Sequence, residues 1–227
     1  SLPTWLVAEW LDVYGFDTTR QICQAGNRHP SVIAQPNTLC TTAEQLADRL
    51  AEEGIQCELD PEKTMLRLLH GGHLTKIQAF LDGYFIIQDP TAAEAMQQAA
   101  PSPGWTIADL CAAPGGKSIV LAMLMNDTGL ILASDSNEQR LQKIQQNIQR
   151  MRLNCIKITK FHQIEAKIKK LKTVDAIVLD VPCSNTGVLA RRAEVRWRLQ
   201  KNDIDILCKT QRQLLVQAAS LCHQKTR

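Results

Sequence analysis

The sequence lacks any hydrophobic run that approaches the length of a membrane span. Its N-terminal segment SLPTWLVAEWL also lacks the charged start and the cleavage signature of a secretory signal peptide. Trp5, Trp10 and Leu11 are better explained as part of an amphipathic helix. Internal repeats and low-complexity segments are absent too. The sequence therefore predicts a globular protein without a membrane partner.

The eight cysteines include no Cys-x-x-Cys pair, which leaves a zinc site without support. Cys111, Cys155 and Cys208 lie inside apolar strand or helix patterns. This favours reduced thiols and a cytoplasmic setting over a disulfide framework. His70 and His73 fall in the segment HGGH, which is typical of a solvated turn rather than of a metal site. We therefore expect no metal.

The net charge of +3 conceals a division of the chain. Residues 1–137 contain 7 Lys and Arg against 16 Asp and Glu, a net charge of −9, whereas residues 138–227 contain 19 against 7, a net charge of +12. Ordinary solvated helix faces are the simpler explanation for some of these charges. A net charge of +12 on the second part nevertheless predicts a polyanionic partner, and nucleic acid in particular.

The first hundred residues predict a small α+β module. Residues 1 to about 35 have a helical pattern with a break near Gly26-Asn27. Residues 41–55 form a strongly amphipathic pattern that Thr41 or Thr42 can cap. Short strands are predicted at 64–69 and 83–89, and the segment APSPGW (100–105) is typical of a boundary turn. We accordingly assign residues 1–100 to an N-terminal module and residues 101–227 to a second domain.

Strands and helices alternate in this second domain, which predicts an α/β fold with a parallel sheet covered on both faces. Ligands of such sheets bind beyond the carboxyl ends of the strands. Cys111 and Cys183 both follow predicted strands. The predicted strands are 106–110, 130–134, 155–159 and 174–180, and the predicted helices are 117–125, 137–152, 163–171 and 203–222.

The segment Cys-Ala-Ala-Pro-Gly-Gly-Lys (111–117) separates the first of these strands from a helix. Its small side chains allow a ligand to approach the backbone, and the helix N-terminus can bind a negative group. The segment has the spacing of neither a P-loop nor GxGxxG, which disfavours a nucleoside triphosphate. Asp135 ends the next strand, where a carboxylate can accept hydrogen bonds from ribose hydroxyls. Loop and aspartate together predict an adenosine-containing ligand, and a tight turn with an N-capping aspartate is the alternative.

Two long motifs carry a family resemblance. DLCAAPGGKS (109–118) and LDVPCSNTGVLARRAEVRW (179–197) resemble motifs of the RsmB/Sun (Fmu) and Nop/Sun family of RNA cytosine-C5 methyltransferases, and in particular its bacterial ribosomal RNA branch. LPTWLV, QPNTLCTTAEQLADRLAEEGI and GYFIIQDPTAA resemble further segments of the family. The resemblance thus extends over nearly the whole chain.

The resemblance implies a Rossmann-like class I fold that binds S-adenosyl-L-methionine, preceded by an RRM-like RNA-recognition module. Asp135 would bind the cofactor's ribose, and Asp180 would lie beside both cofactor and target base. The family position that normally carries aspartate for the adenine falls near Phe161-His162, where no carboxylate is present. The residues that would wrap the cofactor are Cys111, Ala112, Ala113, Pro114, Gly115, Gly116 and Lys117.

The chemistry explains why such an enzyme needs a cysteine. C5 of cytosine is a poor nucleophile, and addition of a thiolate at C6 activates it. A carboxyl group near N3 assists this addition, and Asp180 precedes Cys183 by three residues. In the family a Thr-Cys cysteine attacks, and the Pro-Cys residue, here Cys183, assists product release. The sequence contains no Thr-Cys, so attack by Cys183 itself is the alternative. The resemblance favours a packing role for Cys111.

The basic segment after Cys183 predicts the RNA contacts. Arg191, Arg192, Arg196 and Arg198 can contact phosphates, and Trp197 can stack on a base or pack. We assign the first three to the RNA site. A solvated basic helix with a buried Trp197 is the alternative. Where Arg192 and Ala193 stand, the family normally has histidine and proline.

The sequence thus predicts a methyltransferase of cytosine C5 in RNA, with small-subunit ribosomal RNA as substrate, whose second domain stops before its last strands. A catalytically inactive RNA-binding paralogue that keeps the cofactor fold is the first alternative. An amide or amine methyltransferase is the second, but it would require an Asn/Asp-Pro-Pro-Tyr-like loop in place of Asp-Val-Pro-Cys.

Overall fold

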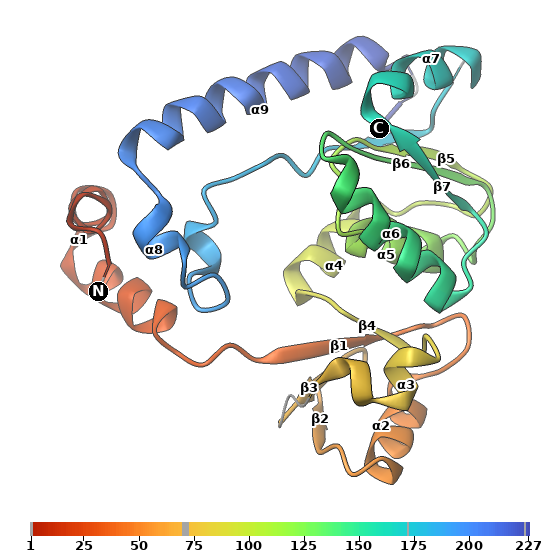
Figure 1. The fold of residues 1–227 in the computed structure, drawn as a ribbon, viewed down its shortest axis with the longest axis horizontal. Coiled ribbons are helices and arrows are strands. Elements are labelled where there is room, and N and C mark those ends of the chain that lie inside the picture. The colour runs from red at the N-terminus through yellow and green to blue at the C-terminus, as the bar shows by residue number, and fades with distance from the viewer. Residues whose placement is uncertain (1, 70–72, 172, 225) are drawn as a thin grey trace. The chain divides into compact units, whose positions relative to one another are not determined.

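A computed structural model describes residues 2–69, 73–171, 173–224 and 226–227. The chain forms two compact units. We call Ser31–Asp180 together with Gln217–Arg227 the sheet unit, and Ser1–Pro30 together with Val181–Val216 the helical unit. Figure 1 labels the helices and strands along the chain. Both β-sheets belong to the sheet unit, and the described residues of the helical unit contain no strand.

The first sheet is antiparallel, with the strand order β2-β3-β1-β4. Its buried core includes Leu46 and Leu50 of α2 and Phe85 of β4. The order of elements, βαββαβ, is that of a ferredoxin-like fold. The elements are β1 (Val32–Pro36), α2 (Ala43–Glu52), β2 (Cys57–Leu59), β3 (Leu66–Leu68), the 3-10 turn η1 (Leu74–Lys76), α3 (Gln78–Leu81) and β4 (Phe85–Ile87).

Helix α2 confirms the predicted amphipathic helix. Thr42 is its N-cap, because the Thr42 hydroxyl accepts a hydrogen bond from the Gln45 amide and the Gln45 side chain accepts one from the Thr42 amide. A cap of this kind stabilises a helix by about 1 kcal/mol. Gly54 follows the helix with a positive φ of 75°.

The prediction of helix up to residue 35 was wrong for its last part. Val32–Pro36 form strand β1, which pairs with β3 on one side and β4 on the other. The β-branched Val32 and Ile33 favour this strand, but the pairing partners are more than thirty residues away in the sequence. Tertiary pairing therefore decided the structure of this segment.

The second sheet is parallel, with the strand order β7-β6-β5-β8. Ile107 and Ile131 belong to the core formed with α4, α5 and α6, whereas Ala108 and Leu132 belong to the core formed with α7 and the end of α9. Helices thus cover both faces, as predicted. The elements are α4 (Pro90–Gln98), β5 (Thr106–Asp109), α5 (Gly116–Leu124), β6 (Leu130–Asp135), α6 (Glu138–Met151), β7 (Ile156–Lys160), α7 (Phe161–Leu171) and β8 (Ala176–Val178).

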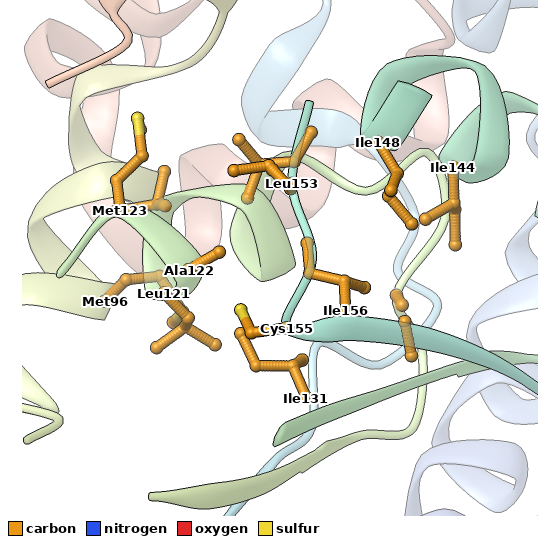
Figure 2. Close-up of a cluster of buried hydrophobic side chains, with 14 of the residues drawn as sticks. Met96, Leu121, Ala122, Met123, Ile131, Ile144, Ile148, Leu153, Cys155 and Ile156 are labelled. Carbon is orange, nitrogen blue, oxygen red and sulfur yellow. The ribbon is translucent and has the colours of Figure 1, made fainter. Parts of the chain in front are cut away.

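Figure 2 shows part of the larger core, where Leu121, Ile131 and Cys155 belong to one cluster of buried side chains. Burial raises the pKa of Cys155 to about 12, so this thiol stays neutral and packs as an apolar side chain. Ala93 and Met96 of α4 also belong to this cluster, although α4 lies inside the predicted N-terminal module. The division between residues 100 and 101 stays a prediction.

The helical unit consists of α1 (Thr4–Gly26), η2 (Thr186–Val188), α8 (Val195–Arg198) and the part of α9 (Lys201–Leu221) up to Val216. Helix α1 ends at the predicted break, with Asn27 as its C-cap. A second break, which the sequence analysis did not predict, occurs at Gly15, whose φ of 73° suits glycine. Gln217 and the following residues of α9 belong to the sheet unit.

Candidate functional site

The Cys111–Lys117 loop lies at the carboxyl ends of the parallel strands. The Leu110 amide donates to the Val178 carbonyl of β8 at 3.1 Å, and the Ala112 amide donates to the Ser134 carbonyl of β6 at 2.8 Å. Helix α5 begins at Gly116 and directs its first amides toward this loop. The structure thus brings the predicted loop to the edge of the sheet where such folds bind ligands.

The two glycines of the loop both have close neighbours. Gly115 has a φ of 106°, and a Cβ there would lie 3.2 Å from Cγ2 of Ile144. A Cβ on Gly116 would lie 2.5 Å from Oε1 of Gln88, which follows β4 of the first sheet. Substitution at Gly116 would therefore require the Gln88 side chain to move.

Asp135 fixes the loop from the end of β6. Its carboxylate accepts hydrogen bonds from the Ala113 amide at 3.2 Å and the Asn137 amide at 2.9 Å. Arg140 lies 3.6 Å from the same carboxylate and donates to the Ala113 carbonyl at 2.6 Å. Each carboxylate oxygen has a second lone pair, which a ribose hydroxyl can use. Contact between Asp135 and a ribose stays a prediction.

Asp109 is a buried carboxylate that the sequence analysis did not assign. It ends β5 inside the first motif, and its Oδ2 accepts a hydrogen bond from the Ser118 hydroxyl at 2.7 Å. Its Oδ1 is buried without a partner among the described residues. Burial raises the pKa of Asp109 to about 6, against the opposing effects of Ser118 and Lys117. A strand-ending aspartate before a small-residue loop is the sequence signal that points to it.

Lys117 and Asp180 form an ion pair across the site, with Nζ 2.5 Å from Oδ2. Lys117 comes from the first turn of α5, and Asp180 follows β8. The two side chains line a cavity of about 220 Å³ in the sheet unit. The other lining residues are Leu74, Phe80, Ile86, Ile87, Gln88, Cys111, Ala112, Ala113, Pro114, Gly116, Ile119, Asn147 and Arg150.

Cys111 lines this cavity as a half-buried thiol. Burial, together with the carboxylates of Asp109, Asp135 and Asp180, raises the pKa of Cys111 to about 11. A thiol with so high a pKa is not ionised at neutral pH and is a poor nucleophile. The surroundings of Cys111 therefore favour the packing role that the resemblance suggested for it.

Arg150 of α6 holds the first sheet against this site. Its guanidinium donates to the carbonyls of Phe80 at 2.5 Å and Phe85 at 3.0 Å, and lies 3.8 Å from the centre of the Phe80 ring. Burial lowers the pKa of Arg150 to about 10, which still leaves it charged at neutral pH. One turn earlier, Asn147 donates to the Pro114 carbonyl of the loop at 3.3 Å. Such tertiary contacts have no signal in the sequence.

Cys183 is exposed and lies in the helical unit. Its loop is fixed on both sides, because Asn185 donates to the Cys183 carbonyl at 3.1 Å and Gln211 donates to the Pro182 carbonyl at 2.8 Å. Asp180 ends one segment of the sheet unit, three residues earlier. The joint action of Asp180 and Cys183 on one base stays a prediction.

The three predicted RNA-contacting arginines differ in their surroundings. Arg191 and Arg192 are exposed, and Arg192 lies 3.8 Å from the carboxylate of Glu194. Arg196 is half-buried and donates to the Gly26 carbonyl at the end of α1, which is a structural contact. Trp197 has 72% of its surface exposed, so the alternative of a buried tryptophan was wrong.

Two other expectations concern metals and membranes. Among the described residues, no group of three or more His, Cys, Asp or Glu side chains could hold a metal ion. His70 of the predicted turn lies outside the described residues. Of the helices that the structure describes, none combines the length and the apolar character needed to cross a membrane. All eight cysteines are free thiols.

Comparison with known proteins identifies the family. The family described as 16S rRNA methyltransferase RsmB/F matches residues 96–226, which is more than half of the chain. The chain belongs to the RsmB/F family of 16S rRNA methyltransferases. Residues 2–72 match the ferredoxin-like domain described for RsmF/B-like methyltransferases, in agreement with the first sheet. The chain therefore combines a ferredoxin-like domain with a parallel-sheet α/β methyltransferase domain of a family that uses S-adenosyl-L-methionine.

Related proteins match nearly the whole length of this RsmB/F-family chain. A probable ribosomal RNA small subunit methyltransferase B of Synechocystis is 35% identical over 97% of the chain and 50% of the relative. A protein with the same description from Bacillus subtilis is 30% identical, again over 97% of the chain and 50% of the relative. The chain thus spans about half the length of the curated relatives it matches.

Solved structures agree with this fold. A methyltransferase homologue from Pyrococcus horikoshii is 27% identical and superposes with a TM-score of 0.74 over 94% of the chain and 68% of the homologue. The structure of NSun6 from Pyrococcus horikoshii with SFG has a TM-score of 0.86 over 98% of the chain and 80% of NSun6. At 19% identity, NSun6 supports the fold alone.

Proposed function

We propose that this chain transfers a methyl group from S-adenosyl-L-methionine to C5 of a cytosine in small-subunit ribosomal RNA. The observation that carries the proposal is the cavity at the carboxyl ends of β5 and β8, where Lys117 and Asp180 meet beside the Cys111–Lys117 loop. The names of the relatives from Synechocystis and Bacillus subtilis support the class of substrate.

The residues of the cavity fit this cofactor. Its amino-acid end carries one ammonium and one carboxylate group, and the cavity offers the carboxylate of Asp180 and the ammonium of Lys117. The side-chain amide of Gln88 also lines the cavity, and its Nε2 has no hydrogen-bond partner among the described residues. By resemblance, Asp135 would hold the ribose, although it does not line this cavity and is 3% exposed. When bound, the cofactor would supply an electrophilic methyl group.

The surroundings of the adenine would differ from those usual in the family. Phe161 and His162 begin α7 directly after β7, and Phe161 is half-buried while His162 is exposed. Neither side chain can accept a hydrogen bond as a carboxylate does. We therefore assign no residue to the amino group of the adenine.

Cys183 would act on the base. Addition of a thiolate to C6 would make C5 nucleophilic enough to accept the methyl group. Removal of the C5 proton by a base and expulsion of the thiolate from C6 would then complete the cycle. By resemblance, the Pro-Cys residue assists this expulsion while a Thr-Cys cysteine attacks. The 227 residues contain no Thr-Cys, which keeps attack by Cys183 as the alternative. Asp180 would assist from the N3 side of the ring.

Arg191, Arg192 and Arg196 would contact the RNA backbone, as predicted, although Arg196 also donates to the Gly26 carbonyl. The exposed Trp197 adds a flat surface on which an unpaired base can stack. A target base in paired RNA must leave its helix at a cost of about a few kcal/mol, which these contacts would offset.

One observation favours a second function. The absence of a carboxylate at Phe161-His162 fits an RNA-binding protein that keeps the cofactor fold but does not transfer methyl groups. In that case the chain binds RNA and cofactor without modifying cytosine.

Incubation with methyl-labelled cofactor and small-subunit ribosomal RNA separates the two functions. We expect label in 5-methylcytidine after digestion of the RNA to nucleosides. RNA binding without label in any nucleoside would support the second function. Label in a nucleoside other than cytidine would contradict both.

A further inference from the structure

A second cavity lies beside Cys183 within the helical unit. It has a volume of about 520 Å³ and shares no lining residue with the cavity at the Cys111–Lys117 loop. Its walls come from the loop after Pro182, from α8 and from the first turns of α9. The lining residues are Cys183, Ser184, Asn185, Val195, Arg198, Leu199, Gln200, Asp203, Ile206 and Leu207.

The lining of this cavity has two kinds of surface. Leu199, Ile206 and Leu207 provide apolar surface, to which a flat aromatic ring can pack. The amides of Asn185 and Gln200 provide donors and acceptors of the kind that pair with the edges of a nucleobase. One base with its sugar needs both kinds of surface and fits within such a volume.

Charge favours a polyanionic ligand at the same place. Residues 181–216 contain 7 Lys and Arg against 3 Asp and Glu. Arg198 is exposed on the cavity and has no ion pair or hydrogen bond with any described residue, whereas Arg196 donates to the Gly26 carbonyl. Asp203 is the acidic residue of the lining, and its carboxylate already accepts a hydrogen bond from the backbone amide of Gln200 at 2.9 Å. Arg198 is therefore available to a phosphate.

We propose that this cavity binds the RNA nucleotide next to the methylated cytosine. The base packs against Leu199 and Ile206, and its phosphate pairs with the guanidinium of Arg198. Because Cys183 lines the cavity, a nucleotide held there presents its neighbour in the strand to the thiol. The inference rests on the proposed function, since it takes RNA as the substrate and Cys183 as the reacting thiol.

The test compares two pairs of variants of the whole chain. Arg198→Gln is matched by Arg212→Gln, which removes the same charge from an exposed position of α9 outside the cavity. Ile206→Glu is matched by Val216→Glu on the same helix, because the two side chains are 61% and 64% exposed. The probe is a fluorescein-labelled single-stranded RNA of about twelve nucleotides with one cytosine, and the readout is fluorescence anisotropy.

We expect Arg198→Gln and Ile206→Glu each to weaken RNA binding about tenfold, and Arg212→Gln and Val216→Glu to change it less than about twofold. Thermal melting should be the same for all four variants, since each site is exposed. Equal losses within each pair would overturn the proposal. They would show that RNA binding depends on the net charge of the protein and not on the cavity. Absence of RNA binding by the unmodified chain would overturn it as well.

An abasic nucleotide in the probe sharpens this test. Removal of the base directly beside the cytosine should weaken binding by the unmodified chain but not by Ile206→Glu. A further loss in Ile206→Glu would contradict the proposed cavity. Failure of the proposed function is a separate result: the matched pairs would still differ in RNA binding, but the unmodified chain would transfer no methyl group.

Discussion

The loops that carry Cys111 and Cys183 both follow parallel strands, yet their surroundings differ. Cys111 is half-buried among three carboxylates that help raise its pKa to about 11. Cys183 is exposed in a segment with an excess of basic residues. The first environment suits binding of a small molecule with charges of both signs, and the second suits contact with a polyanion. In the proposed function, the same residue type at equivalent ends of two strands would thus have two roles.

Substitution of the two cysteines should give the largest difference in activity between the two loops. Cys183→Ser should lower the rate of methyl transfer by about a hundredfold or more, because in the proposed function it removes the thiol that acts on the base. Cys111→Ser should change it less than about threefold, since a neutral packing thiol is replaced by a group of similar size. The measurement is the initial rate of label transfer to RNA, with Cys208→Ser as a control at another exposed cysteine.

The Cys183→Ser variant also decides between the two roles of the thiol. A covalent protein–RNA adduct that accumulates on denaturing gels would show that Cys183 assists release. Loss of activity without an adduct would show that Cys183 attacks. Activity equal to that of the unmodified chain would contradict both roles.

Arg150→Met should destabilise the sheet unit by about 3 kcal/mol, because it leaves the carbonyls of Phe80 and Phe85 without their donor. Urea unfolding measures this loss as a lower midpoint. Lys143→Met is the control, since Lys143 is an exposed residue of the same helix. A midpoint as high as that of the control would show that Arg150 does not hold the first sheet in place.

Lys117→Gln should weaken cofactor binding by about tenfold to a hundredfold, because the cavity loses its ammonium group and Asp180 loses its partner. Equilibrium dialysis with labelled cofactor measures the change. Lys160→Gln, which removes a lysine paired with Glu138 outside the cavity, should leave the affinity unaltered. Equal affinities of the two variants would contradict the assignment of the cavity.

Asp109→Asn should change the dependence of stability on pH. Because the pKa of Asp109 rises from 3.8 to about 6 on folding, the folded chain holds more protons than the unfolded chain between these values. The contribution of Asp109 to stability is therefore present below pH 3.8 and is lost as the pH rises toward 6. The stability of the variant relative to the original chain should increase over this interval by about 2 kcal/mol. Urea unfolding at several pH values measures it, and a constant difference would contradict the raised pKa.

The sequence predicted the parallel sheet well because its strands alternate with helices and each buried strand is short and apolar. The loop at Cys111 was predictable because small residues between a strand and a helix allow a ligand to approach the backbone. Strand β1 was not predicted, because its pairing with β3 and β4 depends on distant segments. The sequence did not decide whether Trp197 is exposed or buried, because the local pattern of residues fits both.

The contacts that shape the cavity could not be predicted from the sequence. Arg150 and Asn147 lie on the same helix as several exposed polar residues, and nothing in the spacing distinguishes them. Only the fold shows that Arg150 meets the carbonyls of the first sheet and Asn147 the Pro114 carbonyl. The hydrogen bond of Arg196 was equally impossible to predict, because its acceptor, the carbonyl of Gly26, is 170 residues away in the sequence.

The central claim is that the cavity between Lys117, Asp180 and the Cys111–Lys117 loop binds S-adenosyl-L-methionine. Calorimetric titration of the whole folded chain with this cofactor tests it most directly. The account predicts saturable heat with one site per chain, and its loss or strong weakening in Lys117→Gln. A well-folded chain that gives no binding heat with the cofactor or its demethylated product would contradict the account.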